Sequence, residues 1–212
     1  MLFCQFLLLT KQASIMIYTK SDPYLEVCDV YSKTDKQIEK YLANADYYIK
    51  SRVKRLTDEL KKKTSICANA LRKKMVKKYY NICYRNEELI FSPNGKPEYM
   101  GNNAVKFSVS HSGHYVAAAV SKFKVGVDIQ IILKCNSKIV NYWFNDDEKL
   151  VIKNSLNKDI DFTIIWTKKE AYLKLIGGGL CKNFNEVDYN NVVFNTWVTN
   201  DYVLTMAKFF GE

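Results

Sequence analysis

The hydrophobic pattern of this 212-residue chain switches twice from a helical period to the alternation of strands. Apolar residues near helical spacing predict a helix from Asp35 to about Leu56 and a second helix from about Thr57 to Tyr80. Alternation then predicts strands in segments 105–110, 114–121 and 124–130, which short turns join into an antiparallel series.

The second switch follows the same order. Segments 144–156 and 161–176 read as helices, the first opened by Asn145 or Asp146 and the second ended by glycines. Segments 192–198 and 202–210 read as closing strands, and residues 15–20 as an early one. Helices followed by strands, twice over, predict an α+β fold with two comparable halves.

Positive charge is concentrated in the first half of the chain. Residues 1–106 contain 20 Lys and Arg against 11 Asp and Glu, whereas residues 107–212 contain 12 against 11. This asymmetry favours an anionic partner for the first half, such as nucleic acid, a phosphorylated small molecule or an acidic protein. Solubility alone is the alternative explanation.

The cysteines and the N-terminus bear on the compartment. Six scattered cysteines form no Cys-x-x-Cys motif, and two histidines make a zinc site unexpected. This usage fits a reducing cytosol. The apolar residues 1–10 are far shorter than the ~20 residues that span a bilayer, and Met16 is an alternative start. We therefore expect a cytoplasmic protein that does not bind membranes.

The segment "WTKKEAYLKLIGGGL", from Trp166 to Leu180, combines a helix with a run of glycines. Glu170 and Lys174 share one helix face, and by themselves they would be an ordinary surface pair worth ~0.3–0.5 kcal/mol. Three glycines exceed what one helix end needs, and they allow a ligand or a neighbouring chain to come close.

A carboxylate in the strand "KVGVDIQ" raises the possibility of a metal site. Asp128 lies among Val and Ile residues, where an unpaired charge is costly. Strand alternation puts Gln130 on the same side as Asp128. Mg²⁺ prefers one or two carboxylates plus substrate phosphates, and Asp128 and Glu170 could supply both carboxylates. A strand-end Asp held by backbone N–H groups is the alternative.

Two further segments carry polar groups suited to phosphate. In "FSVSHSGHY", Ser108, Ser110, Ser112 and His111 could donate hydrogen bonds to phosphate oxygens. A serine nucleophile is not favoured here, because no G-x-S-x-G surrounds these residues. The turn "NGKPEY" displays Lys96, which is uninformative alone.

Taken together, four segments resemble the 4′-phosphopantetheinyl transferases. In chain order these are residues 95–97 (Gly-Lys-Pro), 107–113, 125–130 and 166–180, and the closer likeness is to the larger, two-lobed type that activates peptide and polyketide synthetases. The resemblance implies transfer of the phosphopantetheine arm of coenzyme A to a serine of an acyl or peptidyl carrier protein, a holo-[acyl-carrier-protein] synthase activity that releases 3′,5′-ADP.

The resemblance also implies an architecture and partners. Two similar α/β lobes related by a pseudo-twofold axis, residues 1–122 and 123–212, would hold coenzyme A between them, with residues 1–15 a possible extension. We expect a monomer that binds coenzyme A and an acidic carrier protein, with no nucleic-acid partner.

For the reaction itself, the resemblance assigns three residues. Asp128 matches the aspartate of the family's G-[IV]-D motif, a Mg²⁺ ligand. Glu170 matches the glutamate of its W-[ST]-x-K-E-[AS] motif, a Mg²⁺ ligand and candidate base for the carrier serine. Lys174 matches a lysine that contacts the phosphates and assists the leaving group.

For binding of coenzyme A, the resemblance assigns residues from two parts of the chain. Lys96, Ser110 and His111 match positions that hold its phosphates. Lys63 and Thr64 fall where the family places further phosphate contacts.

Gln130 departs from the pattern of many two-lobed members, which carry a second acid at this position. An amide oxygen ligates Mg²⁺ weakly, so a coenzyme A-binding relative with impaired catalysis is the alternative function. A basic nucleic-acid-binding protein is the third, although the lysine-rich helix has few aromatic residues and that function would leave Asp128 and Glu170 unexplained.

Overall fold

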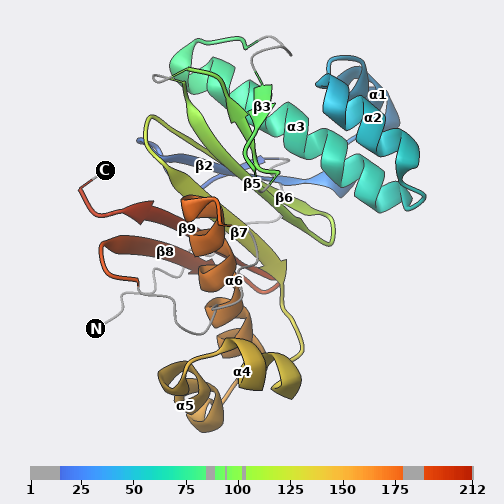
Figure 1. The fold of residues 1–212 in the computed structure, drawn as a ribbon. Helices are drawn as coiled ribbons and strands as arrows, with labels where there is room; N and C mark the ends of the chain where they lie inside the picture. The colour runs from blue at the N-terminus through green and yellow to red at the C-terminus, as the bar shows by residue number, and fades with distance from the viewer. Residues whose placement is uncertain (1–14, 85–88, 94, 102–103, 179–188, 212) are drawn as a thin grey trace.

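The computed structural model describes residues 15–84, 89–93, 95–101, 104–178 and 189–211. Helices and strands form an N-terminal and a C-terminal lobe (Figure 1), which confirms the predicted mixed fold. The N-terminal lobe contains β1 (Ile15–Ile17), β2 (Tyr24–Asp29), the 3₁₀ turn η1 (Val30–Ser32), α1 (Asp35–Ala43), α2 (Tyr47–Arg55), α3 (Glu59–Tyr80), β3 (Leu89–Phe91), β4 (Pro97–Tyr99), β5 (Lys106–Ser112) and β6 (Tyr115–Ser121). The C-terminal lobe contains β7 (Val125–Ile131), α4 (Ser137–Trp143), α5 (Asp146–Asn154), α6 (Lys158–Ile176), β8 (Val192–Val198) and β9 (Tyr202–Phe209).

Two antiparallel sheets form the centre of the molecule. The first has the strand order β1-β2-β6-β5, and the second has the order β7-β9-β8. They pack face to face through buried apolar residues on alternate positions of β2, β6, β7 and β9. α3 covers the outer face of the first sheet and α6 that of the second. The layers therefore follow the order α3, first sheet, second sheet and α6, which places these two helices on opposite sides.

The helix predicted from Asp35 to about Leu56 is two helices, α1 and α2. The chain breaks between them at Asp46, whose carboxylate is buried and contacts α3. Arg72 and Asn69 donate hydrogen bonds to this carboxylate, and Lys73 approaches it to 3.0 Å. An aspartate with three partners on α3 favours a turn over a continuous helix, and apolar spacing alone does not reveal this.

The predicted three-strand antiparallel series is wrong in its last member. β5 and β6 pair as a hairpin, but β7 leaves this sheet and pairs with β9. The reason is the placement of its apolar residues: Val127 and Ile129 pack against the inner face of the first sheet rather than continuing it.

β5 and β7 nevertheless lie side by side, joined by serine side chains instead of a backbone ladder. The backbone N–H of Val127 donates to Ser108 Oγ at 3.0 Å, and that of Ile131 donates to Ser112 Oγ at 3.1 Å. Between them, Ser110 Oγ donates to Asp128 Oδ1 at 2.7 Å. We call this set of three serine contacts the serine seam. It joins the two lobes next to Asp128.

The serine seam leads to a stability prediction. Ser108→Ala leaves the buried N–H of Val127 without its acceptor, and we expect a loss of about 1–3 kcal/mol in the free energy of unfolding. Urea denaturation followed by circular dichroism measures it. Ser32→Ala is the matched control, since the hydroxyl of Ser32 is exposed and bonds the backbone of Asp29. Equal midpoints for the two variants would contradict the role of Ser108.

The helix ends follow the sequence signals. Asn145 and Glu148 form a capping box at the start of α5. α6 ends at Gly177, which has a φ of 71°, so the predicted glycine stop is confirmed. α4 and α5 pack around the N-terminal end of α6 (Figure 1). None of the described helices is long and apolar enough to cross a membrane. The apolar residues 1–10 lie outside the described residues.

Candidate active site

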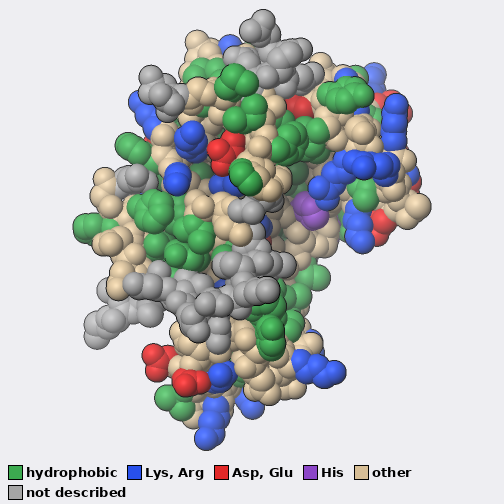
Figure 2. All heavy atoms as spheres, viewed as in Figure 1, with side chains coloured by type: hydrophobic (Ala, Val, Ile, Leu, Met, Phe, Trp, Pro, Cys, Tyr) green, Lys and Arg blue, Asp and Glu red, His purple; other side chains and the backbone are tan. Residues whose placement is uncertain are grey.

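A cleft of about 570 Å³ lies where the two lobes meet. Its walls come from α2, α3, β5, β7 and α6 and from the turn that carries Gly95 and Pro97. Lys and Arg side chains gather on the neighbouring surface over α1–α3 (Figure 2). Six of the residues singled out from the sequence line the cleft: Ser110, His111, Asp128, Gln130, Glu170 and Lys174.

Asp128 is the buried centre of this group, with 1% of its surface exposed. Its Oδ1 accepts hydrogen bonds from Lys174 Nζ at 2.6 Å and from Ser110 Oγ at 2.7 Å. Strand alternation on β7 points it away from the apolar packing between the sheets and toward α6. The carboxylate is therefore paired, as a buried charge must be.

Glu170 and Lys174 lie one turn apart on α6 and face the same cleft. Burial raises the pKa of Glu170, and the neighbouring charge of Asp128 raises it further, although Lys174 opposes both effects. Lys174 bridges the site, because its ammonium contacts both Asp128 and Ser110 Oγ. The cleft thus holds two carboxylates that repel one another, and the ammonium of Lys174 pairs with one of them, Asp128.

Gln130 lies on the same side of β7 as Asp128, as strand alternation predicts. Its Nε2 donates to Asp128 Oδ2 at 3.3 Å, and its Oε1 accepts from Ser112 Oγ at 3.1 Å. The amide therefore connects the carboxylate to the serine seam, with its nitrogen toward Asp128 and its oxygen toward Ser112.

The oxygen set fits a hard divalent cation. The two carboxylates are the sparse donor set that Mg²⁺ usually takes from a protein, with water and substrate phosphates completing the shell. The raised pKa of Glu170 beside Asp128 shows that positive charge would relieve this pair. Among the described residues, no group of three or more His, Cys, Asp or Glu is placed to hold a metal ion.

The serines of β5 contact β7. Ser108, Ser110 and Ser112 are the candidates for phosphate contacts, and in the structure all three oxygens take part in the serine seam. Ser110 still lines the cleft. The contacts of these serines depend on the position of β7, and the sequence did not predict that β7 lies beside β5.

His111 lies at the exposed end of β5 beside the cleft. The cleft walls lower its pKa by desolvation, and the charges of Lys174 and Arg52 lower it further. A histidine in this position is a hydrogen-bond donor and acceptor more than a fixed charge.

Lys96 takes a different place from the other predicted residues. Its ammonium donates to the backbone oxygen of Lys174 at 2.6 Å, at the C-terminal end of α6. Burial lowers its pKa, and Lys124, Lys106 and Lys174 lower it further. Lys96 lines a neighbouring cavity of about 160 Å³, while Gly95 and Pro97 on either side of it line the main cleft.

Lys63 and Thr64 do not line the cleft. Lys63 forms a surface ion pair with Asp35 at 2.8 Å, and the buried hydroxyl of Thr64 donates to the backbone oxygen of Lys61. The face of α3 that lines the cleft carries Ser65, Ala68, Asn69 and Arg72 instead. The phosphate contacts expected of Lys63 and Thr64 stay predictions.

Several residues that line the cleft were not assigned to the site from the sequence. Arg52 on α2 lines the cleft and acts on His111, and Tyr48 and Trp166 add aromatic walls. The basic run "KSRVKR" was the available signal for Arg52. The prediction of one long helix in this region did not place Arg52 at the site. In the structure α2 is a separate helix, and its face with Arg52 lines the cleft.

Comparison with known proteins agrees across both lobes. A family model described as "4'-phosphopantetheinyl transferase, N-terminal" matches residues 31–123, and the 4'-phosphopantetheinyl transferase superfamily model matches residues 124–207. The chain is 34% identical over 99 residues to 4'-phosphopantetheinyl transferase gsp of Aneurinibacillus migulanus, covering 45% of this chain and 41% of that protein.

Two further relatives give the same result. The chain is 35% identical over 98 residues to 4'-phosphopantetheinyl transferase psf-1 of Bacillus pumilus, covering 44% and 42% of the two chains. It is 30% identical over 96 residues to 4'-phosphopantetheinyl transferase AcpT of Salmonella typhi, covering 43% and 50%. The matched part thus spans about half the length of these relatives or less.

Proposed function

Because this chain belongs to the 4′-phosphopantetheinyl transferase superfamily, we propose that it transfers the phosphopantetheine arm of coenzyme A to a serine of an apo carrier protein. The observation that carries the proposal is the meeting of Asp128, Glu170 and Lys174 in the cleft between the lobes. These residues come from two segments far apart in the sequence, and carboxylates that can hold Mg²⁺ beside a lysine suit phosphoryl transfer.

The proposed substrate site extends along the cleft from this group. Coenzyme A carries a diphosphate and a 3′-phosphate, so it brings several negative charges into a site lined by Arg52, His111 and Lys174. Tyr48 and Trp166 offer flat apolar surfaces beside them. The basic N-terminal lobe gives a field that attracts both coenzyme A and an acidic carrier protein.

Glu170 is the proposed base. Its raised pKa favours acceptance of the proton from the carrier serine, whose oxygen attacks the phosphorus that bears the pantetheine arm. The bond between that phosphorus and the leaving 3′,5′-ADP oxygen breaks as the new bond forms. Lys174 neutralises charge on the departing phosphate, and Asp128 holds its ammonium in place.

Asp128, Glu170 and the amide oxygen of Gln130 are the proposed ligands of Mg²⁺. A bound Mg²⁺ supplies positive charge to the diphosphate and stabilises its developing negative charge. Residues 1–122 and 123–212 are the proposed lobes, and the protein is proposed to act as a monomer, since one chain supplies both walls of the cleft.

The decisive experiment is intact-mass spectrometry of an apo carrier protein incubated with coenzyme A, Mg²⁺ and this chain. A gain of the phosphopantetheine mass on the carrier serine supports transfer. Saturable binding of coenzyme A without that gain would favour the second candidate, a binding protein with impaired catalysis. Gln130 is the observation behind this second candidate, because many two-lobed members have an acid there.

The metal site gives a separate prediction. Gln130→Glu adds a carboxylate beside Asp128 and Glu170, and we expect the Mg²⁺ concentration for half-maximal transfer to fall about tenfold. Calorimetric titration of Mg²⁺ in the presence of coenzyme A checks the same change without turnover. Gln37→Glu is the matched control, since a glutamate preserves the capping box of α1. An unchanged Mg²⁺ dependence in Gln130→Glu counts against this placement.

A further inference from the structure

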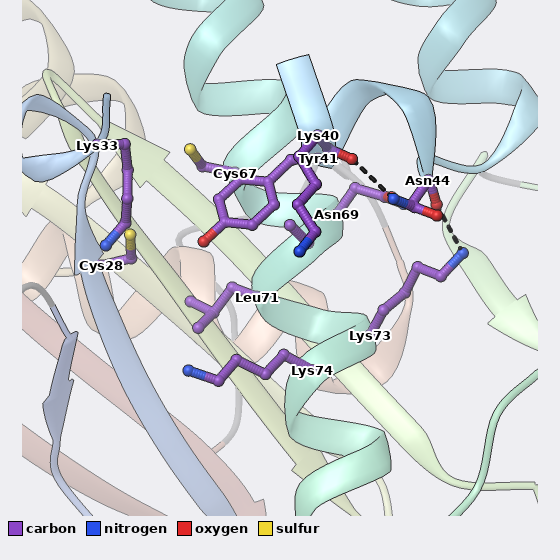
Figure 3. A pocket seen from close by; sticks show the side chains of 11 residues that line it. Cys28, Lys33, Lys40, Tyr41, Asn44, Cys67, Asn69, Leu71, Lys73 and Lys74 are labelled. Atoms are coloured by element: carbon purple, nitrogen blue, oxygen red, sulfur yellow. Dashed lines mark hydrogen bonds between the residues drawn. The ribbon is translucent and has the colours of Figure 1, made fainter. Parts of the chain in front are cut away.

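A second cavity, of about 250 Å³, lies between α1, α3 and β2. Figure 3 shows it from close by, with Cys28 from β2, Tyr41 from α1 and Leu71 from α3 among the residues on its wall. α3 lines this cavity and the candidate active site with different faces, and of the described residues only Asn69 borders both. None of the candidate catalytic residues lies here, so the proposed transfer reaction leaves the cavity unexplained.

The inner wall of the cavity offers little to a polar ligand. Cys28, Cys67 and Leu71 are buried, with 3%, 2% and 4% of their surfaces exposed. The thiol of Cys28 already donates to a backbone oxygen at 3.6 Å. The amide of Asn69 is also occupied, because its nitrogen donates to the carboxylate of Asp46 at 2.6 Å and its oxygen accepts from the Asp46 backbone N–H at 3.3 Å. A ligand body in the cavity therefore meets mainly apolar surface.

Lysines supply the charge around this cavity. Four of them line it, as Figure 3 shows: Lys33, Lys40, Lys73 and Lys74. None of the described residues on its wall carries a carboxylate. The ammonium of Lys73 is already held by Asp46 at 3.0 Å. Lys40 from α1 and Lys74 from α3 are exposed, and neither forms an ion pair with a described residue. These two lysines can therefore turn to a ligand.

The charge and the volume define what the cavity can take. Two ammonium groups from different helices repel one another, and an anion between them turns that repulsion into attraction. A lysine ammonium acts as a point charge, so it accepts a carboxylate, a sulfonate or a phosphate. The cavity has the volume of roughly eight water molecules at ~30 Å³ each. A fitting ligand is thus small, with an apolar body and an anionic head group.

We propose that this cavity is a binding site for a small amphipathic anion, with an aliphatic body of about six to eight carbons and a carboxylate or similar head group. The body lies against Cys28, Cys67 and Leu71, and the head group lies between Lys40 and Lys74. The site is separate from the proposed coenzyme A site, because the two use different faces of α3. It does not depend on the proposed transfer reaction.

Calorimetric titration of the full chain with octanoate, in buffer without coenzyme A or Mg²⁺, tests the proposal. We expect saturable binding. Hexanoate is expected to bind about tenfold more weakly, because it buries two fewer methylene groups. Octan-1-ol has the same aliphatic body without the charge, and we expect it to bind at least about tenfold more weakly than octanoate. Octylamine, which carries the opposite charge, is expected not to bind.

Two variants locate the bound octanoate. Ala70 lines the cavity on α3 and is only partly buried, and methionine is a good helix former, so Ala70→Met fills the cavity and keeps the helix. We expect its affinity for octanoate to fall at least about tenfold, with an unchanged circular dichroism spectrum and urea midpoint. Lys40→Gln combined with Lys74→Gln keeps the cavity and removes two exposed charges. We expect about tenfold weaker binding and a smaller salt dependence.

Lys153→Gln is the matched control, since Lys153 is exposed on α5 and does not line the cavity. It should bind octanoate as tightly as the unmodified chain. The proposal is overturned if octanoate does not bind saturably, if octan-1-ol binds as tightly, or if the double lysine variant or a folded Ala70→Met keeps the original affinity. Because the readout is binding without coenzyme A or a carrier protein, failure of the transfer reaction leaves this test intact.

Discussion

Glu170→Gln is expected to reduce phosphopantetheine transfer by about 10³-fold or more. The substitution removes both the proposed base, whose loss typically costs 10²–10⁴-fold, and one of two carboxylate ligands for Mg²⁺. The side chain keeps its size, so the cleft keeps its shape. Initial rates of carrier modification at saturating coenzyme A and Mg²⁺, followed by intact mass, give the ratio.

Folding of the Glu170→Gln variant should be unimpaired. Burial and Asp128 both disfavour the ionised form of Glu170, so its removal relieves repulsion in the absence of metal. The urea midpoint in metal-free buffer is expected to be at or above that of the unmodified chain. Glu59→Gln on α3 is the matched control, since its exposed carboxylate pairs only with Lys62 at the surface. Near-normal turnover in Glu170→Gln would contradict the proposed role of Glu170 as base.

Gly126→Ala is expected to be the most destabilising glycine-to-alanine substitution in the described part of the chain. We expect it to lower the free energy of unfolding by about 4 kcal/mol or more. A Cβ at this position would lie 1.9 Å from the backbone oxygen of Ala171 and 2.5 Å from the backbone nitrogen of Leu175. Both atoms belong to α6, so the helix itself would have to move away from β7. Urea denaturation measures the loss.

Gly178→Ala is the control for this prediction. Its new methyl group would meet only the side chain of Ile176, at 3.1 Å, and a flexible side chain can yield. A similar loss of unfolding free energy in both variants would contradict the close contact between the backbone of α6 and Gly126 on β7. The glycine of the G-[IV]-D motif thus has a packing reason, because it lets α6 bring Glu170 and Lys174 toward Asp128.

The fold was predictable where each signal is local. The helix start at Asn145, the glycine stop at Gly177 and the alternation of β7 depend on neighbours in the sequence, and the structure has all three. The prediction was wrong where residues far away in the sequence determine the local structure. Asp46 turns the chain because α3 supplies Arg72, and β7 changes sheets because its apolar face meets the other lobe.

The candidate site was predictable to a similar degree. Helix periodicity predicted that Glu170 and Lys174 share one helix face, and strand alternation predicted that Asp128 and Gln130 share one side of a strand. The structure brings these two pairs into one cleft. Their roles stay predictions. Lys63 and Thr64 lie outside the cleft, on a helix where the resemblance is weak and where an error of one residue turns a side chain by ~100°.

The serine seam makes the joint between the lobes unusually dependent on side chains. A backbone ladder keeps its spacing whatever residues it carries, whereas this joint holds its spacing through three hydroxyl groups. Replacing one of them by threonine, alanine or cysteine would change the gap between β5 and β7 without altering either strand's own pairing. Single substitutions in the serine seam can therefore change the width of the cleft in the course of evolution. Because Ser110 donates a hydrogen bond to Asp128, such a change also moves the environment of that carboxylate.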